Sequence, residues 1–188
     1  MAEQQRDRSN QNFKGGPQRE VEEKQFTENV MSIDRVSRVV KGGRRFRFRA
    51  LIVLGDGKGK VGVGVSKGQD VQSAVQKAAD VAKKNMITVA LYNETIPHEA
   101  TAKVGGAHIM IKPAATGTGL KAGGVVRTIL ETAGVHNILS KSLGSSNKIN
   151  SAYATIAALE QLVPAGEWTT AEMRSKAQPK KAAAKGAK

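Results

Sequence analysis

Hydrophobic and polar positions alternate along the first part of the chain, and a period of two predicts β-strands. One strand is expected over roughly residues 30–40, and a second over RRFRFRALIVL after a turn at KGGRR. In the second strand Arg45, Arg47 and Arg49 share one face, whereas the other face carries Phe46, Phe48, Ala50 and Ile52. Side chains on opposite faces of a strand meet different environments, so we expect the phenylalanines in the core and the arginines outside.

A third strand and a helix complete this first unit. Val61, Val63 and Val65 alternate with Gly62, Gly64 and Ser66, which leaves one strand face almost without side chains. From an N-cap at Asp70 to about Asn85, apolar residues then recur at helical spacing, namely Val71, Ala74, Val75, Ala78, Val81 and Ala82. The pattern predicts a β-β-β-α unit, with a helix on one face of the sheet and the other face open.

The second unit mixes strands and helices. MITVALY, ATAKV and AHIMIK are typical of strands, and GVVRTILETAG predicts a helix that ends at Gly134. VHNILSKSLG is ambiguous and leaves a further short strand open. A last helix is expected over INSAYATIAALEQL, with an apolar stripe of Ile149, Ala152, Tyr153, Ile156 and Leu159. We expect an α+β protein with two domains, 27–90 and 91–165, between a flexible arm (1–26) and a basic flexible tail (166–188).

Composition favours a polyanion as partner. The 188 residues carry a net charge of +14, and residues 35–67 alone contain ten basic residues and one acidic residue. There is no cysteine, and the three histidines are scattered, so we expect neither disulfides nor a metal site. No apolar run approaches the ~18 residues of a membrane span, which favours a soluble, cytoplasmic protein.

Two glycine-rich runs raise the question of nucleotide binding. In GDGKGKVGVG, residues 55–64, the glycines satisfy G-x-G-x-x-G, but a strand follows instead of the helix that such a site needs. A kinase-type loop would require H-R-D and D-F-G elements, which do not occur. The run is typical of a hairpin turn at Asp56-Gly57.

The second run, PAATGTGLKAGG at residues 113–124, precedes a predicted helix and is flanked by Lys112 and Lys121. Backbone N–H groups and a helix dipole would coincide there, which favours contact with an anion over a plain connecting loop. An RNA phosphate would serve as that anion. No nucleophile elbow and no carboxylate pair accompanies the run, so a catalytic site is not indicated.

Two long stretches carry a resemblance to a known family. RVSRVVKGGRRFRFRALIVLGDGKGKVGVGVSKGQDV with AVQKAADVAKKNMITVAL, and GTGLKAGGVVRTILETAGVHNILSKSLGSSN, closely resemble the bacterial small-subunit ribosomal protein five family over about residues 27–165. The resemblance implies an N-terminal domain similar to a double-stranded-RNA-binding fold that lacks the leading helix. It also implies a C-terminal two-layer α/β domain of a type shared with some small-molecule kinases and translocating GTPases.

Members of that family are not catalytic and use no cofactor. The resemblance implies binding to 16S rRNA, contacts with small-subunit proteins four and eight, and a place beside the path by which mRNA enters the subunit. It further implies support of subunit assembly and an influence on decoding accuracy. A nucleotide-dependent small-molecule kinase of the same C-terminal fold remains the alternative, and a free RNA chaperone is a third option. Neither a small-molecule substrate nor a membrane is expected.

The residues expected to bind RNA follow from charge and from the resemblance together. VKGGR matches the family loop that reaches rRNA near the spectinomycin site, whereas Arg45 and Arg47 replace less basic family residues and are selected by charge alone. Few aromatic residues are present, so phosphate and shape recognition is favoured over base stacking. The predicted RNA-binding residues are Arg35, Arg38, Lys41, Gly42, Gly43, Arg44, Arg45, Arg47, Arg49, Lys58, Lys60, Lys67, Lys112, Thr116, Gly117, Thr118, Gly119 and Lys121.

Overall fold

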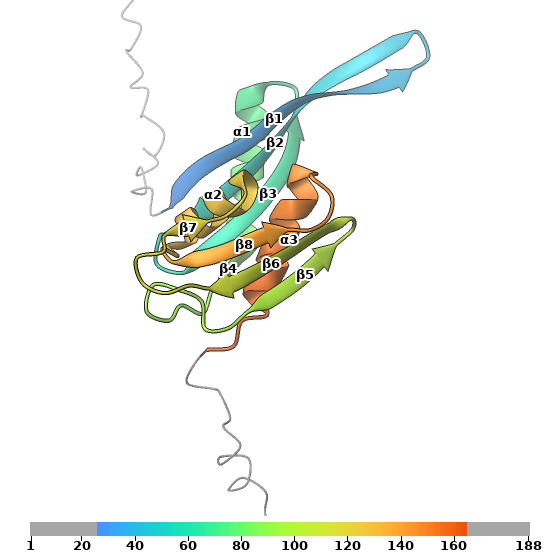
Figure 1. Cartoon of the computed structure of the whole chain (residues 1–188). Helices are drawn as coiled ribbons and strands as arrows, with labels where there is room; N and C mark the ends of the chain where they lie inside the picture. Colours follow the sequence, from blue (N-terminus) through green and yellow to red (C-terminus); the bar gives the residue numbers. More distant parts are fainter. Residues whose placement is uncertain (1–25, 165–188) are drawn as a thin grey trace, which may run out of the picture.

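The computed structural model describes residues 26–164, which form two four-stranded sheets and three helices (Figure 1). The strand order is β1-β2-β3-β4 in the first sheet and β5-β6-β8-β7 in the second. The predicted α+β class with a β-rich first unit and an α/β second unit is confirmed. The arm and tail predicted to be flexible lie, apart from Phe26, outside the described residues.

A long hairpin dominates the first sheet. Strands β1 (Thr27–Val40) and β2 (Gly43–Gly55) pair antiparallel across a tight turn in which Gly42 has a φ of +90°, a conformation that favours glycine. Strand β3 (Lys60–Gly68) pairs with β2 only as far as Phe48. Beyond Phe48 the hairpin is therefore a two-stranded ribbon, and Figure 1 shows it projecting from the rest of the molecule.

Helix α1 (Val71–Lys84) packs on the glycine face of the first sheet, with Asp70 as its N-cap as predicted. A Cβ added to Gly64 would lie 2.0 Å from the carbonyl oxygen of Ala78, and one added to Gly62 would lie 2.4 Å from that of Ala82. The absence of side chains on this face thus allows the helix backbone to approach the strand. Alanines of the helix and Ala50, Ile52 and Leu54 of β2 form the small core between them.

The opposite face of the first sheet is covered, so the prediction of an open face is wrong. Leu51 and Val53 of β2 and Val61 and Val63 of β3 belong to one large core, which they share with the second unit. The physical reason is that these side chains make the face strongly apolar, and such a face is stable only when another layer buries it. The two units are consequently joined through a continuous core.

The second unit contains most of the predicted strands. β5 (Ala100–Val104) and β6 (Ala107–Pro113) form a hairpin, and β8 (Ile138–Ser142), inside the ambiguous segment, pairs with β6. The two-residue strand β7 (Leu120–Lys121), which runs parallel to β8, was not predicted. The predicted strand MITVALY is shortened to β4 (Met86–Thr88) and pairs with β3, so it extends the first sheet instead of the second.

Both helices of the second unit are present. Helix α2 (Gly124–Ala133) ends at Gly134, whose φ of +84° confirms the predicted left-handed stop. Helix α3 (Lys148–Glu160) begins after Asn147, whose side-chain oxygen accepts a hydrogen bond of 3.2 Å from the Ile149 N–H. Lys148 is thereby the first helical residue.

The apolar stripe predicted for α3 is only partly correct. Ala152 and Leu159 are buried, but Tyr153 and Ile156 are half-buried, and the remaining buried positions are Ser151, Ala154, Thr155 and Ala158. Contacts with the second sheet, α2 and β3 explain the difference, because a helix enclosed by several elements is buried on more than one stripe.

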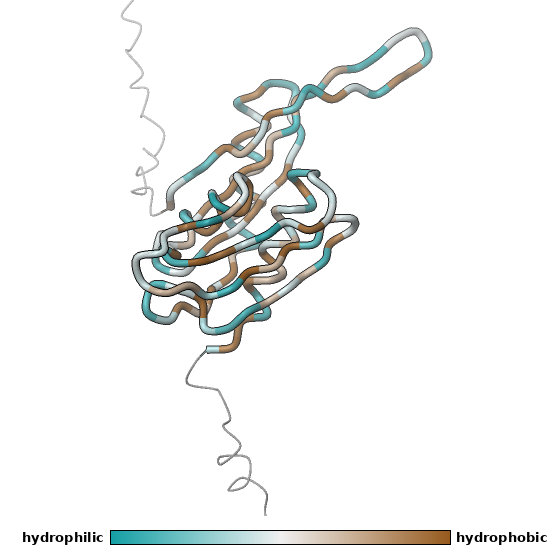
Figure 2. The backbone as a smooth tube through the Cα atoms, viewed as in Figure 1, coloured by the Kyte–Doolittle hydropathy of each residue, from teal (hydrophilic) through white to brown (hydrophobic). Residues whose placement is uncertain are grey.

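Phe46 is a further correction, since its side chain is 50% exposed and does not enter the core. It lies on the two-stranded ribbon, beyond the end of β3. The guanidinium carbon of Arg35 lies 4.0 Å from the centre of its ring. Figure 2 shows hydrophobic positions alternating with hydrophilic ones out along this ribbon, so the alternation continues where no core faces it. Phe48, by contrast, is half-buried and packs against the core below α1.

Candidate nucleic-acid interface

Four exposed cations, three from the hairpin and one from β3, lie on one face of the first sheet. Arg38 lies directly opposite Arg45, and Lys67 of β3 lies opposite Arg49, in the register that carries Leu51 and Val65 on the same face. Arg38, Arg45, Arg47 and Lys67 are all exposed. Their face is the one that buries the large core further along the strands, and the cations begin where the second unit no longer covers it.

Arg49 differs from these four because it has an acidic partner. Its guanidinium lies 2.8 Å from a carboxylate oxygen of Asp34, its direct neighbour on β1. Among the predicted arginines, Arg49 is therefore already neutralised within the protein, and a contact with RNA would have to compete with Asp34. Sequence analysis missed this role of Asp34, although strand pairing across a short turn could have indicated it.

The other face of the ribbon combines cations with apolar side chains. Arg44 pairs with Val39, and Arg35 and Phe46 lie on the same side. At the tip, Lys41 is exposed, and a Cβ added to Gly42 or Gly43 would meet nothing within 4 Å. The VKGGR tip is thus open on all sides to a large partner.

The turn between β2 and β3, which includes Lys58 and Lys60, has a structural role that the sequence did not reveal. The Gly57 N–H donates to the Thr132 carbonyl at 3.1 Å, and the Gly59 N–H donates to the Ala133 carbonyl at 2.9 Å. These carbonyls belong to the last turn of α2, where no partner exists inside the helix. The glycine-rich turn therefore caps a helix of the second unit and does not cradle a phosphate.

The remaining N–H groups of this turn bind Asp56. Its carboxylate accepts hydrogen bonds from the N–H groups of Lys58 at 2.8 Å and Lys60 at 2.9 Å. Partial burial would raise the pKa of Asp56, but these hydrogen bonds and the nearby Lys60 charge outweigh it and hold the pKa below its ordinary 3.8. The Lys58 and Lys60 side chains remain exposed, while every N–H group from Gly57 to Lys60 is used internally.

The loop at 113–124 is also organised from within. The side-chain oxygen of the buried Asn137 accepts hydrogen bonds of 3.1 Å from the N–H groups of both Gly117 and Gly119. The anion site expected from these N–H groups is therefore occupied by a protein side chain. Lys112 forms an ion pair of 3.1 Å with Glu99, whereas Lys121 and Thr116 are exposed and Thr118 is half-exposed. Nothing in the local pattern pointed to Asn137, which lies a strand and a helix further along the chain.

The predicted residues lie in three places. The ribbon and Lys67 lie at one end of the molecule, and Figure 1 shows the loop before α2 at the other. The β2–β3 turn lies at the C-terminal end of α2, also away from the ribbon. Within residues 26–164, no group of three or more His, Asp or Glu side chains is arranged to hold a metal ion. No helix in that range is long and apolar enough to cross a membrane.

A two-unit α+β body with a projecting basic ribbon defines the class as a polyanion-binding protein. Two family models match the chain, "Ribosomal protein S5, N-terminal domain" over residues 26–90 and "Ribosomal protein S5, C-terminal domain" over residues 102–172. The chain belongs to the ribosomal protein S5 family of the small ribosomal subunit. The resemblance seen in the sequence is thereby confirmed.

Membership of this family also decides between the alternatives left open above. The family is a structural constituent of the ribosome and is not enzymatic, so the kinase alternative is set aside. Association with the small subunit and with rRNA follows at the level of the family. Which residues of this chain meet RNA is a separate question, addressed next.

Proposed function

We propose that this chain binds 16S rRNA in cytoplasmic ribosomes through the basic ribbon, with Lys41, Arg44 and Arg45 among the phosphate contacts. The observation that carries the proposal is the position of these charges. They lie on a two-stranded projection outside the core, where a large polyanion can reach them from several sides. The guanidinium group of an arginine can donate two parallel hydrogen bonds to the oxygens of one phosphate. The glycines of the tip have no side chain, so RNA can approach the backbone there.

The mechanism is positioning without turnover. Because one core joins the two units and the β2–β3 turn caps α2, the ribbon and the loop at 113–124 are held at fixed places on a single body. Surfaces at opposite ends of such a body can hold two RNA segments, or RNA and protein, in a set geometry. In this way the chain would support assembly of the subunit.

The finer parts of the proposal concern neighbours in the subunit. The chain contacts ribosomal proteins four and eight, borders the path by which mRNA enters, and influences decoding accuracy through protein four. The tip of the ribbon lies near the spectinomycin site. A smaller set of RNA contacts comes from the two glycine-rich loops. Their backbone N–H groups are used inside the protein, but exposed or half-exposed side chains can still contact RNA, namely Lys58, Lys60, Thr116, Thr118 and Lys121.

Salt dependence tests the assignment to the ribbon. The triple variant K41A/R44A/R45A removes three charges, and we expect the slope of log affinity for 16S rRNA against log salt to fall by about three units. A control matched in total charge, K103A/R127A/K141A, removes one arginine and two lysines from exposed positions of the second unit. It should change the slope by less than about one unit. Equal effects of the two triples would mean that binding follows net charge and not the ribbon.

A further inference from the structure

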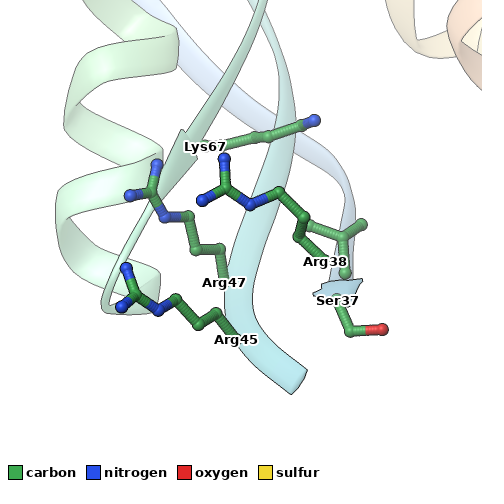
Figure 3. A pocket seen from close by; sticks show the side chains of 6 residues that line it. Ser37, Arg38, Arg45, Arg47 and Lys67 are labelled. Atoms are coloured by element: carbon green, nitrogen blue, oxygen red, sulfur yellow. The ribbon is translucent and has the colours of Figure 1, made fainter. Parts of the chain in front are cut away.

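Two adjoining recesses lie where the ribbon leaves the body of the molecule. The first encloses about 240 Å³ and is lined by Val36, Ser37, Arg38, Arg45, Arg47 and Lys67. The second encloses about 420 Å³ and is lined by Arg47, Lys67, Gly68, Gln69, Asp70, Ser73 and Lys77. Arg47 and Lys67 line both. In Figure 3 the guanidinium groups of Arg38 and Arg47 lie next to each other and that of Arg45 points the same way, whereas Lys67 passes above them with its ammonium toward the opposite side.

The charges around the first recess are not balanced by the protein. Arg38, Arg45, Arg47 and Lys67 form no ion pair with any residue of the described chain, while Arg49 beside them is paired with Asp34. Arg38 and Arg45 are direct cross-strand neighbours, and like charges in that position destabilise a sheet. An anion in the recess would remove this repulsion.

The second recess adds the start of α1. Its N-cap, Asp70, makes no side-chain hydrogen bond to the first turn, so the carboxylate does not satisfy the N–H groups there. The positive end of the helix dipole therefore acts alongside Arg47, Lys67 and Lys77. Asp70 contributes the one carboxylate of the lining, against three cations. Ser73 donates its hydroxyl to the Asp70 carbonyl at 3.1 Å, so it is not a donor to an anion, and the cations and the first N–H groups of the helix are the groups that would bind one.

We propose that this double recess binds a pair of closely spaced phosphate groups, one in each recess, with Arg47 and Lys67 between them. Two sources supply that chemistry, neighbouring phosphates of an RNA backbone and a free polyphosphate. The inference extends the proposed function, and its RNA arm rests on it. The recess is distinct from the ribbon tip, because neither Lys41 nor Arg44 lines it.

Calorimetric titration of the full chain with inorganic tripolyphosphate and with orthophosphate tests the recess. We expect tripolyphosphate to bind one to one and at least tenfold more tightly than orthophosphate, because only the former reaches both recesses. The variant R47Q/K67Q should weaken tripolyphosphate binding by about tenfold or more, since two charge-assisted contacts are lost. The control K103Q/R127Q removes the same pair of residue types from exposed positions of the second unit and should change it by less than about twofold.

A second variant separates geometry from charge. R47K/K67R keeps the total charge but places an ammonium where the guanidinium was and a guanidinium where the ammonium was, so a built site binds tripolyphosphate more weakly in this variant. Unchanged affinity would show that charge alone attracts the probe, and the proposal would be overturned. Equal losses in R47Q/K67Q and K103Q/R127Q, or no preference for tripolyphosphate over orthophosphate, would overturn it as well. Thermal melts of each variant establish that it is folded.

Competition with 16S rRNA distinguishes the two sources. If RNA occupies the recess, tripolyphosphate displaces it, and R47Q/K67Q lowers the salt slope of RNA binding by about two units. If RNA binding is unchanged in R47Q/K67Q while tripolyphosphate binding is lost, the ligand is a free polyphosphate. The proposed function fails instead if the wild-type chain does not bind 16S rRNA, or if K41A/R44A/R45A and K103A/R127A/K141A have equal effects, so the two failures are told apart.

Discussion

Replacing Gly64 with alanine tests the account of how the first sheet and α1 fit together. The added Cβ would lie 2.0 Å from the Ala78 carbonyl oxygen and 2.6 Å from the Ala82 nitrogen. Both are helix backbone atoms, which cannot turn aside as a side chain can, so α1 must move away from β3. Overpacking of a core costs typically 1–3 kcal/mol, and the backbone clash places G64A near the upper end, at about 3 kcal/mol.

Urea and thermal unfolding measure this change. For a chain of this size about 3 kcal/mol corresponds to a fall in Tm of roughly 6–12 °C. The control is G124A, at the first residue of α2, where an added Cβ meets nothing within 4 Å. Alanine favours helix over glycine, so G124A should be neutral or stabilise by up to about 1 kcal/mol. A loss in G64A no larger than about 0.5 kcal/mol would refute the close packing of α1 on the glycine face.

Three further predictions concern polar contacts. D34A should cost less than about 1 kcal/mol in urea unfolding, because its pair with Arg49 is partly exposed, and should raise the salt slope of RNA binding as Arg49 is released. N137A should destabilise the protein by about 2 kcal/mol and speed hydrogen exchange at Gly117, whereas a slow exchange would contradict the bond to Asn137. The lowered pKa of Asp56 means that its contribution to stability is complete above pH 3.8 and is lost as the pH falls through the folded-state value. The difference in unfolding free energy between wild type and D56N should therefore shrink below about pH 4, and a difference independent of pH would count against the charged carboxylate.

The local pattern was sufficient for most elements and for the faces of the strands. The alternation in β2 correctly separated Arg45, Arg47 and Arg49 from Phe48, Ala50 and Ile52, and Asp70 and Gly134 marked helix ends correctly. Phe46 was assigned to the core because it continues the same alternation. What decides its exposure is the point at which β3 ends, and that information lies outside the strand itself.

Long-range partners account for the other differences. A strand of three residues, β4, carries too little pattern to indicate which sheet it joins. The valine face of β3 required a cover, but the sequence did not identify the second unit as that cover. The glycine-rich run before α2 predicts open N–H groups, but two of them bind Asn137, which is close in space and distant in sequence. The run at 55–64 predicts a hairpin turn, but not that this turn donates to α2 carbonyls. The basic character of the ribbon, in contrast, followed directly from charge placed at every second residue.

Sedimentation of a cell lysate through a sucrose gradient, with the full-length protein detected by antibody, tests the central claim most directly. The account predicts that the protein tracks the small subunit stoichiometrically at low salt and remains with it at moderately high salt. The persistence at high salt is expected because many phosphate contacts and protein neighbours act together on one rigid body. Recovery of most of the protein at the top of the gradient, separate from the subunit, would contradict the account.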